Sequence, residues 1–139
     1  MFILKISDTA IALGMISTAA FAAGHMIKDG VAHDQSVANG VVLADKIVAP
    51  DNGWMVVHRT DASKKPGKVV GHAPLRAGEN VDVAAILNEP VSPGEMLMLM
   101  GHSEAGGKYA GIFEYTLGPK EDGPVKHDGK LVMHVITAQ

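Results

Sequence analysis

From residue 40 onward, hydrophobic and polar residues alternate along much of the chain with a period of two. The clearest case lies within residues 93–104, where a Pro-Gly turn leads into a segment that alternates leucine with methionine or histidine. Successive side chains of a β-strand point to opposite faces of the sheet. The pattern therefore predicts a strand that is apolar on both faces, and one of these faces carries Met96, Met98, Met100 and His102.

Turn-forming residues separate other short apolar segments at intervals of about ten residues, which is typical of a β-sandwich or barrel. No segment has the 3.6-residue period of an amphipathic helix. Seven strands are predicted: Val41–Val48, Trp54–Arg59, Lys68–Ala73, Asn80–Leu87 (with Val81, Val83, Ala85 and Leu87 toward the core), the methionine strand, Tyr109–Leu117 and Lys130–Thr137. We expect an all-β domain over residues 40–139, an antiparallel β-sandwich of immunoglobulin-like or cupredoxin-like kind, with a closed barrel as the alternative.

The N-terminal region has the pattern of a secretory signal peptide over residues 1–22. Lys5 precedes an apolar segment, and Ala20-Phe21-Ala22 matches a cleavage site, with cleavage after Ala22 or Ala23. An uncleaved anchor is the alternative, but the apolar segment is shorter than the roughly 20 residues that span a bilayer. We expect a periplasmic or extracellular protein with no membrane span after cleavage. Residues 23–39, which contain Gly24 and Gly30 and are followed by Gly40, are predicted to form a flexible tail.

Composition narrows the functional classes. The chain has 139 residues, a formal net charge of −3 and only 12 Lys and Arg, so no basic patch for nucleic acid is expected. It has no cysteine, which excludes disulfides, thiolate zinc sites, cysteine nucleophiles and blue-copper centres. No arrangement of residues typical of catalysis is present, so we expect a protein that is not an enzyme.

Several turn and core motifs along the chain follow the order seen in a family of β-sandwich domains. They include the segment from Asn52 to His58, the segment from Pro66 to Gly71, and the segments Leu75–Gly78, Asn80–Val83, Gly94–Leu97, His102–Glu104, Gly111–Glu114 and Asp122–Val125. Together they resemble an uncharacterised family of secreted β-sandwich domains of archaeal and bacterial surface and periplasmic proteins. The resemblance covers about residues 40–138 and implies the fold and the location. It implies no activity.

Histidine and methionine supply the candidate metal ligands. Thioether and imidazole groups are preferred by Cu(I), so Met98, Met100 and His102 form one candidate site. Neighbours in this row lie about 6.6 Å apart along the strand, so an ion would also need a histidine from another strand. That ligand would be His58, His72 or His134. The alternative is that the methionines only fill core space.

A second candidate site lies at the N-terminus that cleavage after Ala22 would create. The new end would read Ala23-Gly24-His25, which resembles the amino-terminal copper- and nickel-binding motif of albumins. An amino group, two amide nitrogens and the His25 imidazole can surround Cu(II) or Ni(II) in a square plane.

Two functions follow from these observations. The first is a non-enzymatic module that acts through its surface, in envelope assembly, adhesion or a larger complex. It would contact a protein partner or a second copy through the apolar methionine strand. The second is a small copper carrier that uses histidine and methionine ligands.

Overall fold

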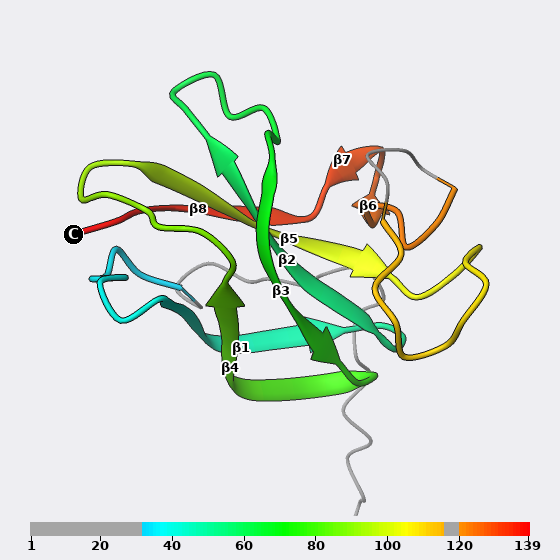
Figure 1. Ribbon diagram of the computed structural model, residues 1–139. Helices are drawn as coiled ribbons and strands as arrows, with labels where there is room; N and C mark the ends of the chain where they lie inside the picture. Colours follow the sequence, from blue (N-terminus) through cyan, green and yellow to red (C-terminus); the bar gives the residue numbers. More distant parts are fainter. Residues whose placement is uncertain (1–31, 116–119) are drawn as a thin grey trace, which may run out of the picture.

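The computed structural model describes residues 32–115 and 120–139 (Figure 1). Within these ranges the chain is built from strands, which confirms the predicted all-β class, and contains no helix that could cross a membrane. Six strands form one antiparallel sheet in the order β1-β4-β3-β2-β5-β8. Their bounds are β1 Val41–Ala49, β2 Gly53–Thr60, β3 Val69–Leu75, β4 Gly78–Leu87, β5 Met96–Ser103 and β8 Met133–Thr137.

The sheet curls around a single core. β3 pairs with β4 only through Gly71 and His72, and beyond this short contact β1 and β4 run in a different direction from β2 and β5 (Figure 1). The buried residues of β1 and β4 thereby pack in one cluster with those of β2, β3, β5 and β8. The largest fully buried members of this cluster are Ile47, Met55, Leu97, Leu99 and Ile136.

One predicted core position is wrong. Val83 and Ala85 are buried, as expected, but Val81 is 62% exposed. Between them Asp82 has a φ of 51°, and the pairing of β4 with β1 skips this residue. The left-handed conformation at Asp82 breaks the alternation of the strand, so Val81 pairs with the exposed Lys46 on the outer face.

The predicted strand Tyr109–Leu117 is also wrong where the structure describes it. Residues 109–115 form turns and irregular backbone, and residues 116 and 117 lie outside the described ranges. The predicted strand Lys130–Thr137 is divided at Val132, between β7 (Lys130–Leu131) and β8. β7 pairs instead with β6 (Lys126–His127) in a small ribbon. Asp128 and Gly129 connect the ribbon with φ values of 49° and 74°, as in a tight hairpin turn.

Residues 32–39, part of the predicted flexible tail, pack against the domain. Ala32 and Val37 belong to the core cluster. The Gln35 side chain donates to and accepts from the backbone of Leu43 in β1, with both distances 2.8 Å. The Gln35 backbone pairs with Ala138, and its carbonyl accepts from the amide of Gln139. Gln35 thus joins the β1 edge of the sheet to the segment that follows β8. Residues 23–31, like the predicted signal peptide, lie outside the described residues.

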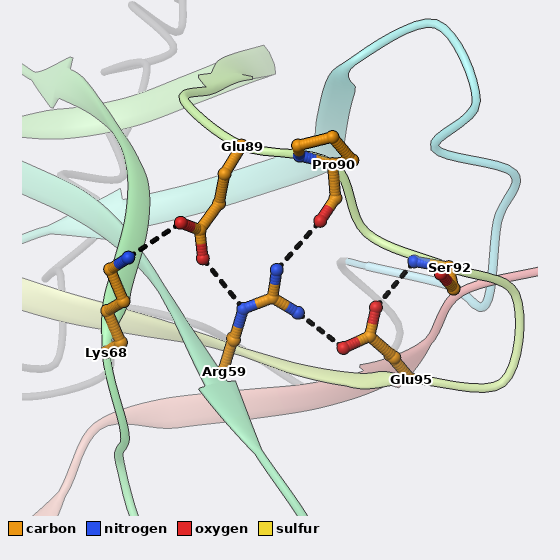
Figure 2. Close-up of polar contacts among 6 residues, drawn as sticks. All are labelled: Arg59, Lys68, Glu89, Pro90, Ser92 and Glu95. Atoms are coloured by element: carbon orange, nitrogen blue, oxygen red, sulfur yellow. Dashed lines mark hydrogen bonds and ion pairs between the residues drawn. The ribbon is translucent and has the colours of Figure 1, made fainter.

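A cluster of charges ties β2 to the connection between β4 and β5 (Figure 2). The Arg59 guanidinium donates to Glu89 at 2.9 Å, to the carbonyl of Pro90 at 2.7 Å, and to Glu95. Lys68 donates to the other oxygen of Glu89 at 2.7 Å. Hydrogen bonds from Lys68 and Arg59 lower the pKa of the Glu89 carboxyl. The cluster fixes the point at which the chain enters the methionine strand β5.

Candidate metal centre

The methionine strand β5 lies between β2 and β8, and its own chain covers both of its faces. Leu97 and Leu99 belong to the core cluster, and Met98 and Met100 are fully buried on the opposite face. The predicted alternation of the strand is therefore confirmed. The expectation that a partner contacts this methionine strand is not confirmed, because the side chains of Met98 and Met100 have no exposed area for a partner. A protein partner stays a prediction, but it would have to bind elsewhere on the domain.

Two histidines meet on the methionine face. In the pairing of β2 with β5, His58 lies opposite Met98 and His102 lies opposite Trp54, four residues further along β5. The two imidazoles approach each other across this distance, and their Nε2 atoms lie 3.3 Å apart. The rings are inclined by 27°, with centroids separated by 5.5 Å. His58 is 1% exposed and His102 is 0% exposed, so the pair is closed to solvent.

The opposite ring nitrogens are held by backbone carbonyls. Nδ1 of His58 lies 2.9 Å from the carbonyl oxygen of Gly67, and Nδ1 of His102 lies 2.6 Å from that of Asp122. A carbonyl only accepts, so both Nδ1 atoms donate a proton. Hydrogen bonds of this kind fix the tautomer and the ring orientation of histidines that bind metals. Both Nε2 lone pairs are therefore directed at the space between the rings.

Asp122 organises the segment that covers the pair. It is 1% exposed and has a φ of 42°, a conformation that aspartate tolerates better than most residues. Its carbonyl accepts from His102, and its carboxylate accepts from the amide of Glu114 at 2.8 Å. The neighbouring Pro124 forms a bridge with His102. Asp122 therefore links one histidine to the backbone between two aromatic residues, Phe113 and Tyr115.

The aromatic rings of Phe113 and Tyr115 pack against the histidine pair. The Tyr115 ring centroid lies 4.6 Å from that of His102 and 6.0 Å from that of His58, edge-on to both. The Phe113 ring lies 6.0 Å from that of His102. Sequence reasoning assigned these aromatics to a strand and missed this role. Their signal was the presence of two of the chain's few aromatic residues in a glycine-rich stretch.

Burial keeps both imidazoles neutral. Loss of hydration lowers the pKa of His102 to about 4, against a smaller opposing effect of its hydrogen bond to Asp122; the neighbouring His58 lowers this pKa further. Burial also lowers the pKa of His58, with the Gly67 hydrogen bond opposing. At neutral pH both rings hold one proton each, which is the state in which imidazole binds metals.

The other candidate ligands have different positions. Met98 and Met100 lie on the face of the pair, opposite His58 and Val56 respectively.

The other candidate histidines lie away from the pair. The His72 ring contacts Phe113 and Trp54, with ring centroids 4.5 and 5.6 Å apart. His134 pairs with Leu99 and so lies on the other face of β5. His25 lies outside the described residues. Within the described ranges, no three His, Asp or Glu side chains gather into a group that could hold a metal ion.

Residues 31–139 match a domain of unknown function, DUF7282. The chain belongs to the DUF7282 family. This agrees with the predicted resemblance to an uncharacterised family and extends the domain to residues before position 40. Comparison of this DUF7282 protein with curated proteins and with solved structures finds no match.

Proposed function

We propose that this DUF7282 domain is a non-enzymatic module that binds a copper ion between His58 and His102. The observation that carries the proposal is a shortage of protons in the histidine pair. The histidine pair makes three polar contacts. The Nδ1 atom of each ring contacts a backbone carbonyl, and the two Nε2 atoms contact each other. Three hydrogen bonds need three protons, and two neutral imidazoles hold two. The neutral pair thus turns two lone pairs toward each other.

A cation between the rings relieves this repulsion. A proton would serve, but the lowered pKa values of both rings disfavour a third proton at neutral pH. A metal ion serves without that cost, because it binds neutral imidazoles. With metal–nitrogen bonds of about 2.0 Å, one ion can bond two nitrogens that lie 3.3 Å apart. Met98 and Met100 lie on the same face of β5 as His102, and thioether groups favour copper among the first-row metals.

The proposal keeps the expected location and the absence of catalysis. A periplasmic or extracellular site rests on the signal-peptide pattern of residues 1–22. A carrier or storage role is consistent with a site in which both donor nitrogens are buried, because a catalytic metal needs an open position for substrate.

A surface function is the second proposal, and a specific feature favours it. Leu43 and Ile86 are 38% and 75% exposed on β1 and β4, and Val81 is exposed on β4 as well. A partner or a second copy would bind this outer face of β1 and β4 rather than β5. Size-exclusion chromatography with light scattering separates the two proposals. The copper module requires no oligomer. Self-association that is abolished by Ile86→Lys would support the surface function.

The test of copper binding uses the full chain with His25→Ala, which removes the N-terminal candidate site. We expect one equivalent of copper to bind and to shift the Nε2 resonances of His58 and His102 in ¹⁵N-edited NMR spectra. His58→Asn should abolish this binding, and the matched control His72→Asn should leave it unchanged.

Two results would overturn the proposal. One is copper binding that survives in a folded His58→Asn protein. The other needs no variant at all: Nε2 resonances that stay unchanged when copper is added to the parent chain.

A further inference from the structure

We infer that the histidine pair takes a monovalent soft ion, Cu(I) or its surrogate Ag(I), as a three-coordinate complex in which the Met100 sulfur is the third ligand. This inference rests on the proposed function and adds the charge of the ion, its coordination number and a third ligand.

The coordination number follows from the distance between the two nitrogens. An ion bound to only two ligands in a line would hold them about 4 Å apart, with bonds of about 2.0 Å. Two bonds of about 2.0 Å to nitrogens that keep their spacing of 3.3 Å would meet at an angle of about 110° at the ion. Such an angle is that of a three- or four-coordinate ion, so the two histidines leave at least one coordination position to another donor.

The register of β2 and β5 identifies that donor. His58 lies opposite Met98, Val56 opposite Met100, and Trp54 opposite His102. The pair Val56–Met100 is therefore midway between the two histidines on the same face of the sheet. Met98 lies one position further, beside the backbone of His58. Met100 is fully buried, and its thioether is the kind of soft, uncharged ligand that selects Cu(I).

The charge of the site selects a monovalent ion. All three donors are neutral, and the Tyr115 ring packs edge-on against both imidazoles. A monovalent ion among these neutral donors places one positive charge in the buried site, whereas a divalent ion places two. The solvation cost of burial grows with the square of the ionic charge, about fourfold from one to two charges.

The experiment compares Ag(I), Cu(I) and Zn(II) by competition titration of the full chain carrying His25→Ala. We expect the monovalent ions to bind at least about 100-fold more tightly than Zn(II). Met100→Leu, which keeps side-chain volume, should weaken Ag(I) binding by about tenfold or more. Met98→Leu, the matched control, should change it less than about twofold. X-ray absorption of the Cu(I) complex should show two nitrogen ligands and one sulfur ligand, with the sulfur lost in Met100→Leu.

The outcomes separate this inference from the proposed function. Zn(II) binding as tight as Ag(I) through His58 and His102 would overturn the inference and leave the proposed function standing. Loss of Ag(I) affinity in Met98→Leu but not in Met100→Leu would overturn the choice of the third ligand. No shift of either histidine with any of the three ions would overturn both proposals.

Discussion

Acidification should destabilise the metal-free domain through His102. Burial lowers the pKa of this imidazole to about 4, whereas in the unfolded chain it has the ordinary value of 6.5. Between these two pH values the unfolded chain binds a proton that the folded chain does not. Stability is therefore full above pH 6.5, falls as the pH decreases toward 4, and loses nothing more from His102 below that. The difference in pKa corresponds to about 3 kcal/mol of unfolding free energy.

Urea unfolding in the presence of a chelator, measured at steps between pH 7.5 and 4, tests this magnitude. His58 acts in the same direction, since burial lowers its pKa too. Carboxyl groups with lowered pKa values, such as Glu89, add a loss that begins nearer pH 4. The comparison that isolates the imidazole is His102→Gln, in which the decline between pH 6.5 and 4 should be smaller by about 3 kcal/mol. Parallel curves for the two proteins would refute the argument from burial.

Three further substitutions test the packing around the site by urea unfolding at pH 7.5. Gly53→Ala should lower the free energy of unfolding by about 2 kcal/mol or more, because the added methyl group would lie 2.2 Å from the carbonyl oxygen of His102. An unchanged urea midpoint would show that β2 and β5 separate easily at this position. Gln35→Ala should cost about 1–2 kcal/mol through two lost hydrogen bonds to Leu43, and a neutral result would mean that water replaces them at no cost. Arg59→Lys should cost about 1 kcal/mol, since an ammonium group cannot span the partners of the guanidinium; equal stability would reduce the cluster to a weak surface ion pair.

The period of the hydrophobic pattern was sufficient to place most of the sheet. β1, β2, β3, β4 and β5 each lie within about two residues of a predicted strand, because turn chemistry and alternation act locally. The misses lie where the backbone departs from the regular strand. Asp82 reverses the orientation of Val81, and nothing in the residue types at 80–83 marks that left-handed conformation. The segment 109–115 contains apolar and aromatic residues that cover a site instead of pairing in a sheet.

The sequence predicted two residues of the site as candidate ligands, but it did not predict that they lie together. His58 and His102 were named among the candidate ligands on chemical grounds, but they are separated by 44 residues. Their approach depends on the register of β2 against β5, and one sequence does not determine this register. The carbonyls of Gly67 and Asp122 were beyond prediction for a further reason. Backbone acceptors are present at every residue, so side-chain identity carries no signal of which carbonyl will hold an imidazole.

The position of Gln35 determines when this domain can complete its fold. Its side chain binds β1, which follows closely in the chain, but its backbone binds Ala138 and Gln139. Asp34 likewise accepts from the amide of Thr137, a contact that spans 103 residues. Such non-local contacts form slowly, since the long intervening chain must first be ordered. A growing chain therefore cannot join the residues before β1 to the segment after β8 until that last segment has been synthesised.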